Sequence, residues 1–385
     1  MIFKTVIVSK PNFSILSACE LPSFKRIALN KLFLIAAAST AAFFSMPSMA
    51  AAPVEFTYQD WQVICDNTRT CRLAGYQAED NNDLPVSILL IRRAGANAGV
   101  IGKVKLGGAK DSSSKALLQL GSRHRISLFI NDKDLGETKA FSTASGDADF
   151  TSAQVTALLD ALSKSSKIEL VLRNTRWRLS DKGATAVMSK ADEAQGRIGT
   201  TSAFINSVPV TKPNNSVLPP KAAPQLRLIT PNATLRANSN KKFSMKSSQL
   251  ASLMQGTMKD MSSDCPNLND ASPWRVSRLN STKLLVQHGC WLSAYNAGSG
   301  AWVMNDRPPY NPVLVTTLAT DYDNGKISAV HKGRGLGDCL NQTYWIWTGT
   351  RFTKSYESST GLCRLVEVGG AWRMPTYVTE VKISR

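Results

Sequence analysis

Histidine is scarce in this chain of 385 residues, which contains only His124, His288 and His331, none at metal-ligand spacing. Zinc sites combine closely spaced cysteines, usually with histidines, so this shortage argues against a zinc site. The signature motifs of serine hydrolases, zinc proteases and phosphate-binding loops are also missing. We therefore predict no metal and no other cofactor, and sequence motifs assign no catalytic residue.

Long hydrophobic runs are also scarce, and the longest candidate is Leu32–Phe44. Its thirteen residues would rise only about 20 Å as a helix, short of the roughly 30 Å apolar core of a bilayer. Three basic residues precede the run: Lys25, Arg26 and Lys31. Small residues follow at Ser48 and Ala50, in the positions that a signal peptidase reads. We predict that residues 1–50 are a signal peptide with an extended N-terminal region, cleaved after Ala50 or Ala52, and that the mature chain has no transmembrane segment.

Acidic residues are few relative to basic ones, 28 against 46, which gives a formal net charge of +18. Residues 1–50 contain five basic residues and one acidic residue, so their removal lowers the charge to +14. Such a field favours anionic partners. For an exported protein, periplasmic or secreted, these are an anionic envelope polymer, a lipid headgroup or a host surface, while the signal peptide argues against nucleic acid. A purely solubilising role of the charge is the open alternative.

Of seven cysteines, Cys19 lies in the signal region, and the other six are Cys65, Cys71, Cys265, Cys290, Cys339 and Cys363. An even number in an oxidising compartment predicts three disulfides. The stretch "DWQVICDNTRTC" places Cys65 and Cys71 on either side of a polar turn, so they can face each other across a hairpin. The remaining four cysteines allow three pairings. Sequential pairing closes local loops and is our preferred expectation.

Residues 206–231 contain six of the 17 prolines, and we predict a linker there. The linker would separate an α+β domain, residues 51–205, from a mainly β domain, residues 232–385. In the first domain, "VSILLIRR" and "RISLFI" alternate as antiparallel strands do, and two helices are expected. One begins with a Thr151–Gln154 capping box, and the other ends at Gly196, where Arg197 complements the helix dipole.

The predicted second domain holds six of the eight tryptophans. In "YWIWTGTRF", Trp345 and Trp347 share one face of a strand, and we expect them to pack in the core rather than to form a carbohydrate platform. "DYDNGKIS" places Asn324 and Gly325 between strand-like runs, which predicts a hairpin. One short helix is expected, in "SSQLASLMQGTM".

Three stretches carry a family resemblance: "DWQVICDNTRTC", "GCWLSAYNAGSGAW" and "HKGRGLGDC", the last followed by "WIWTGTRF" and Cys363. In order and spacing they resemble an uncharacterised family of exported bacterial proteins known as domain of unknown function 1176. The first half is also distantly similar to the invasion-associated locus B proteins, which share a tryptophan followed by a close cysteine pair. The resemblance implies an exported location and an architecture, without an activity.

The best candidate for an anion-binding site is "HKGRGLGDC", through Lys332, Arg334, Gly335, Gly337 and Asp338. The glycines leave backbone N–H groups accessible beside two cations, an arrangement that suits an anion. The alternative is architectural, with Arg334 paired to Asp338 in a turn before Cys339. We expect a non-catalytic protein that binds an anionic envelope or surface component. The alternative function is an envelope glycan hydrolase using paired carboxylates, Asp306 and Asp338.

Overall fold

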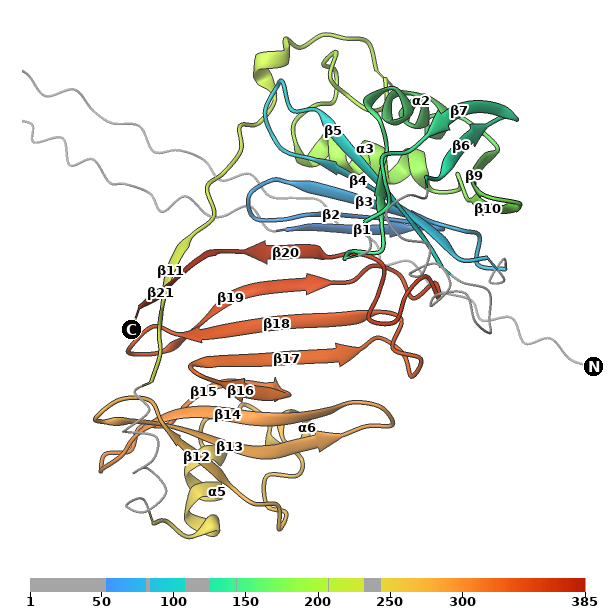
Figure 1. Ribbon diagram of the computed structural model, residues 1–385. Helices are drawn as coiled ribbons and strands as arrows, with labels where there is room; N and C mark the ends of the chain where they lie inside the picture. Colours follow the sequence, from blue (N-terminus) through green and yellow to red (C-terminus); the bar gives the residue numbers. More distant parts are fainter. Residues whose placement is uncertain are drawn as a thin grey trace, which may run out of the picture. The chain divides into compact units, whose positions relative to one another are not determined.

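The computed structural model describes residues 53–80, 84–107, 125–142, 144–206, 208–231 and 244–384. The predicted signal peptide and His124 lie outside these residues. Residues Ala50–Arg385 form one compact unit. Among these described residues, strands hold 42% and helices 13%, so this part of the protein is mostly β (Figure 1). None of the described helices combines the length and the apolar composition needed to cross a bilayer.

The first half of the described chain forms two antiparallel sheets. The larger has the order β1-β2-β3-β4-β5-β8, with β1 (Val54–Tyr58), β2 (Trp61–Cys65), β3 (Cys71–Tyr76), β4 (Val86–Arg92), β5 (Val100–Leu106) and β8 (Ala148–Asp149). The smaller has the order β10-β9-β6-β7, with β6 (Ser127–Ile130), β7 (Lys133–Glu137), β9 (Ile168–Leu172) and β10 (Thr175–Leu179). The strands predicted from "VSILLIRR" and "RISLFI" are β4 and β6.

Two helices pack with these sheets, α2 (Ser152–Leu162) and α3 (Ala184–Ala194), as the sequence predicts. The capping box of α2 is present, because the Gln154 backbone N–H donates to Thr151 Oγ1 at 3.2 Å and the Thr151 N–H donates to Gln154 Oε1 at 3.0 Å. Val155 and Leu158 of α2 are buried in the same hydrophobic cluster as the first sheet. One face of the β2–β4 region is therefore part of a shared α+β core.

The opposite face of the first sheet is covered by the C-terminal part of the chain. Ile64, Ala74 and Leu89 share a hydrophobic cluster with residues that include Trp372 and Met374. The Trp372 indole N–H also donates to a buried serine hydroxyl on β4 at 2.7 Å. Burial on both faces accounts for the nearly continuous apolar run in β4. Because the two halves share a core, the expected two-domain division is not confirmed and stays a prediction.

The second half contains two further antiparallel sheets and a two-stranded ribbon. One sheet has the order β12-β13-β14-β15, with β12 (Arg275–Arg278), β13 (Lys283–Leu292), β14 (Ala297–Asn305) and β15 (Val313–Ala319). The other runs β16-β17-β18-β19-β20, with β16 (Asp321–Asp323), β17 (Lys326–Lys332), β18 (Leu340–Trp347), β19 (Phe352–Ser359) and β20 (Met374–Val378). Two helices precede them, the predicted α5 (Ser247–Gln255) and the short α6 (Met261–Asp264).

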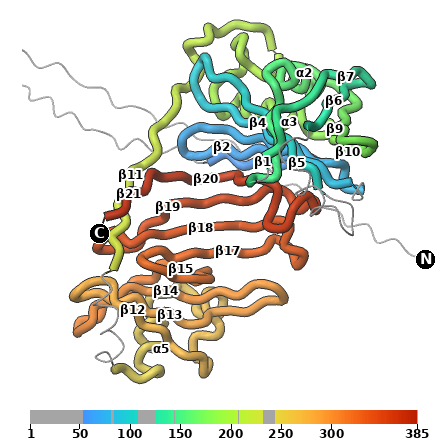
Figure 2. Tube along the Cα trace, viewed as in Figure 1, coloured from blue at the N-terminus to red at the C-terminus, as the bar shows by residue number. Residues whose placement is uncertain are grey.

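The proline-rich segment 206–231, predicted as a linker, contains regular structure. It holds a single 3₁₀ turn, η1 (Asn214–Ser216), and the strand β11 (Gln225–Ile229). β11 pairs in parallel with β21 (Glu380–Ser384), near the C-terminal end of the chain (Figure 2). The sequence gives little sign of this pairing, because the two strands are short and more than 140 residues apart.

The local predictions for the second half are confirmed. Asn324 and Gly325 join β16 to β17 and both have positive φ, 47° and 86°, as a tight hairpin of this type requires. Trp347 is fully buried in a hydrophobic cluster with Ile327 and Phe352, and Trp345 packs against that cluster. The tryptophan face of β18 is thus core.

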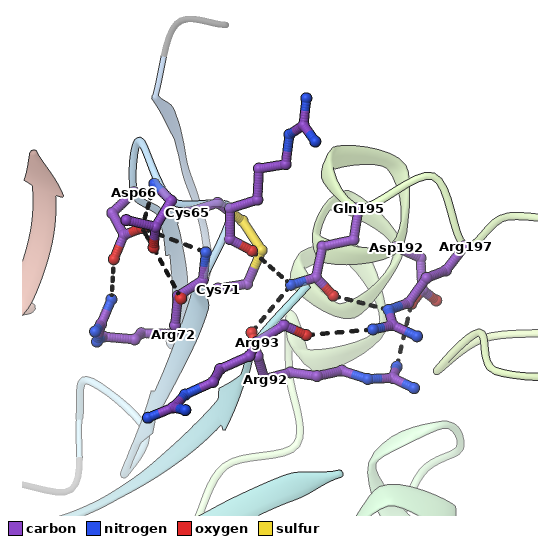
Figure 3. Close-up of a disulfide and its surroundings, with 12 residues drawn as sticks. Cys65, Asp66, Cys71, Arg72, Arg92, Arg93, Asp192, Gln195 and Arg197 are labelled. Atoms are coloured by element: carbon purple, nitrogen blue, oxygen red, sulfur yellow. Dashed lines mark hydrogen bonds and ion pairs between the residues drawn. A yellow bond between two sulfur atoms is a disulfide. The ribbon is translucent and has the colours of Figure 1, made fainter. Parts of the chain in front are cut away.

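All three disulfides follow the preferred sequential pairing: Cys65–Cys71, Cys265–Cys290 and Cys339–Cys363. The first joins directly opposed residues of β2 and β3 (Figure 3). Asp66 supports its turn, since Asp66 Oδ1 accepts from the Thr68 backbone N–H at 2.8 Å. Side-chain hydrogen bonds of this kind favour a tight connection.

The end of α3 is also shown in Figure 3. Gly196 has a left-handed φ of 68°, in agreement with the expected C-cap. Arg197 is fully buried, and its guanidinium donates to Gln195 Oε1 at 2.8 Å (Figure 3). It also donates to the Gly95 carbonyl at 2.8 Å. Besides any interaction with the helix dipole, Arg197 therefore connects α3 to the loop after β4.

Candidate functional site

The glycine-rich loop after β17 contains the predicted anion-binding residues, and its arginine is already paired. Arg334 donates to both oxygens of Asp338, from Nε at 2.8 Å and from Nη2 at 2.5 Å. The side chain of Asp338 is 5% exposed, and that of Arg334 is 40% exposed. The Leu365 backbone N–H also donates to Asp338, at 2.8 Å. The architectural interpretation of Arg334 thus matches the geometry, while anion binding by this loop stays a prediction.

The glycines of this loop have different surroundings. A Cβ at Gly333 would lie 2.7 Å from a sulfur of the Cys339–Cys363 disulfide, so this position requires glycine for packing. Gly337 has a positive φ of 69° and is buried, and Gly335 is exposed beside Tyr295. Lys332 is exposed and, among the described residues, forms no ion pair. Lys332 is consequently the more available of the two predicted cations.

The two carboxylates of the hydrolase alternative are each held by a guanidinium. Asp306 accepts from Arg278 at 2.9 Å, and Asp338 pairs with Arg334. Burial alone would raise the pKa of Asp338, but hydrogen bonds from Arg334 and from the Leu365 N–H outweigh it and hold the pKa below its usual range. A general acid in glycoside hydrolysis needs a raised pKa. The environment of Asp338 lowers its pKa instead.

Within the part of the chain that the structure describes, one group of side chains has the spacing of metal ligands: Asp338, Cys339 and Cys363. Their potential ligand atoms lie within 4.8 Å of one another. Cysteine binds metals as a thiolate, and both sulfurs here are joined in the disulfide. The group is therefore accounted for by the disulfide and the Arg334–Asp338 pair.

A groove of about 610 Å³ lies between the β11–β21 ribbon and the sheet that contains β17–β20. Its apolar lining comes mainly from the ribbon, through Leu228, Val381 and Ile383, with Ile346 contributed by β18. Val381 and Ile383 remain exposed, at 40% and 71%. An open groove with an apolar wall and a polar wall is a common form of ligand site.

The polar lining comes mainly from β17, β18 and β19. It consists of Lys326, Gln342, Tyr344, Ser355, Tyr356 and Thr379, with Arg373 just before β20. Gln342, Tyr344 and Ile346 alternate along β18, so they share the face opposite Trp345 and Trp347. Tyr344 and Tyr356 are directly opposed on β18 and β19. Their rings are stacked, with centroids 5.5 Å apart and planes 18° from parallel.

The charged side chains that line the groove, among the described residues, are both basic. Lys326 Nζ lies over the Tyr344 ring, 3.8 Å from its centroid, in a cation–π contact. Lys326 and Arg373 are exposed, and neither forms an ion pair within the described residues. No aspartate or glutamate that the structure describes lines the groove. Both cations of the groove therefore have no carboxylate partner among the described residues, whereas in the glycine-rich loop this holds for Lys332 but not for Arg334.

The residues of the groove were not found from the sequence. The alternation in "NQTYWIW" indicates that Tyr344 and Trp345 point to opposite faces, but not which face is covered. The remaining wall depends on β11 and β21, whose pairing has no local signal. The cation nearest Tyr344 belongs to "NGKIS", which the sequence identifies only as the end of a hairpin turn.

Comparison with protein families matches residues 55–379 to the family described as "Protein of unknown function (DUF1176)". The chain belongs to this family. The match includes the first sheet, the glycine-rich loop and most of the groove, and it agrees with the resemblance of the three cysteine-containing stretches.

A relative in Escherichia coli (strain K12) is described as "Uncharacterized protein YpfG". It is 24% identical over 332 residues, which cover 78% of this chain and 86% of that protein. No solved structure matches. The distant likeness of the first half to the invasion-associated locus B proteins is not supported by these comparisons.

Proposed function

We propose that this family member is a non-catalytic periplasmic or secreted protein that binds an anionic component of the cell envelope or of a host surface. The observation that supports the proposal most strongly is the groove beside β18, where Lys326 and Arg373 have no carboxylate partner among the described residues. Unpaired cations in a concave site attract and hold anions, because low-dielectric walls strengthen the field.

The location rests on two features of the chain. The order of basic, apolar and small residues before Ala51 is typical of a secretory signal. Three disulfides are typical of proteins that fold in an oxidising compartment. Together with the formal charge of +14 on the expected mature chain, they support a partner among the anionic polymers, lipids or surfaces met outside the cytoplasm.

The hydrolase alternative has less support from the geometry. Both carboxylates that the sequence offered for it are held by arginines, and the pKa of Asp338 is lowered rather than raised. Among the residues that the structure describes, neither these two carboxylates nor any other aspartate or glutamate lines the groove.

One experiment separates the two functions. The purified mature protein is incubated with peptidoglycan sacculi and, separately, with vesicles of anionic lipid, and is then sedimented at low and at high salt. We expect sedimentation with one of these anionic materials at low salt, release at high salt, and no soluble glycan fragments. Fragment release would favour the hydrolase, and failure to sediment with any anionic envelope material at low salt would contradict the proposal.

A further inference from the structure

The two cations of the groove are far apart. Lys326 on β17 pairs with Ile346 on β18. On the other side of the sheet, Gln342 of β18 pairs with Ser358 of β19, and Ser358 pairs with Pro375 of β20. Arg373 lies two residues before Pro375. From Ile346 to Gln342 the strand rises about 13 Å, at about 3.3 Å a residue. Across the sheet, β17 and β20 are separated by three strand spacings, about 14 Å. Since Arg373 lies two further residues along, beyond the level of Gln342, the two backbones are about 24 Å apart, and a single phosphate or carboxylate group does not reach both side chains.

Between the cations, the groove offers neutral hydrogen-bonding groups. In the part of the chain that the structure describes, no hydrogen bond uses the side-chain amide of Gln342 or the phenolic hydroxyls of Tyr344 and Tyr356. These groups both donate and accept. A chain of alcohol groups can satisfy donors and acceptors together, whereas a phosphodiester offers only acceptors. The lining therefore suits a hydroxyl-rich ligand that also carries negative charge.

The position of the groove on a sheet face argues against an extended peptide. Peptides that bind to sheets usually form main-chain hydrogen bonds with a free strand edge. β18 is paired on both sides, with β17 and β19, so its backbone groups are used in the ladder. On the β18 side of the groove, a ligand is therefore recognised by side chains, and here these are cations, an amide and hydroxyls.

From these features we infer that the ligand of the groove is an extended acidic oligosaccharide. Its anionic groups lie at Lys326 and at Arg373, and the sugar hydroxyls between them meet Gln342 and the tyrosine pair. This inference rests on the proposed function and narrows it to one ligand class. It also predicts a minimum ligand length, since only a chain that spans the groove contacts both cations.

The test measures the affinity of the mature protein for oligogalacturonates of increasing length. We expect affinity to rise with length until the chain spans both cations and then to level off. Arg373→Gln should weaken binding of the long oligomers about tenfold to 150-fold, the range of one charge-assisted hydrogen bond, and remove most of the length dependence. Arg351→Gln is the matched control, because Arg351 is exposed and lies outside the groove. It should bind like the parent protein.

Three further probes distinguish the failure of this inference from the failure of the proposed function. Methyl-esterified oligogalacturonates keep the sugars without the charge, and we expect weak binding. Equal affinity for oligoglutamates of the same charge, or binding of anionic lipid vesicles alone, would overturn the glycan inference and leave anion binding intact. If no anionic probe binds, and sacculi do not either, both the inference and the proposed function are contradicted.

Discussion

The glycine-rich loop and the groove both contain an arginine, yet the two side chains are available to a ligand to very different degrees. Arg334 of the loop is held by both oxygens of a buried aspartate. Arg373 of the groove, like Lys326, forms no ion pair within the described residues. A basic motif in a sequence therefore indicates an anion site only when the fold leaves its charge unpaired. The geometry matches an architectural role for Arg334 in the loop, and the proposed binding site is the groove.

The largest effect is expected from removal of the loop's disulfide. Replacement of Cys339 and Cys363 by serine should lower the free energy of unfolding by about 3.5 kcal/mol, since the bridge closes a loop of about 25 residues. Chemical denaturation measures this loss. The Cys65–Cys71 bridge is the control, with an expected loss of about 2.4 kcal/mol because its loop is shorter. A larger loss from the shorter loop would contradict the ranking.

A smaller effect is expected from the ion pair of the loop. Asp338→Ala removes the buried partner of Arg334 and of the Leu365 N–H, and should cost about 2 kcal/mol of stability. Arg334→Ala should cost less, about 1 kcal/mol, because the guanidinium is 40% exposed. The double variant should cost less than the sum of the two.

Measurements on the same variants can contradict the architectural role of Arg334. If Arg334→Ala leaves the melting temperature unchanged and weakens binding to envelope material, the loop is a ligand site after all.

The pH dependence of stability gives a finer test of the same pair. The folded-state pKa of Asp338 lies below its ordinary value of 3.8, so the unfolded chain takes up the proton first as pH falls. The contribution of Asp338 to stability is therefore complete above about pH 5 and is lost as pH falls through 3.8 toward the folded-state pKa. Melting curves of the parent protein and Asp338→Asn should converge in this range. Parallel curves down to pH 2 would show that the carboxylate contributes nothing.

Features that depend on neighbouring residues were predictable from the sequence. The Thr151–Gln154 capping box, the Asn324–Gly325 hairpin and the Cys65–Cys71 bridge each involve residues within a few positions of one another, where spacing fixes geometry. The family was also recognisable from its cysteine-containing stretches.

Features built from distant segments were not predictable. The shared core of Ile64 with Trp372, and the pairing of β11 with β21, join segments that no local pattern connects. The groove depends on that pairing, so the sequence gave no sign that Tyr344 lines it. The glycine-rich loop was predicted as an anion site because its cations and glycines are adjacent in the sequence, although in the fold Arg334 is paired with Asp338.

The central claim is that the groove, rather than the loop, binds the anionic ligand. Its most direct test compares two doubly neutralised variants, Lys326→Gln with Arg373→Gln and Lys332→Gln with Arg334→Gln, which lose the same charge. Their binding to the envelope material that sediments the parent protein is measured as a function of salt. The account predicts at least a tenfold loss of affinity and a weaker salt dependence for the groove variant, against near-parent binding for the folded loop variant. Equal losses, or a loss confined to the loop variant, would contradict it.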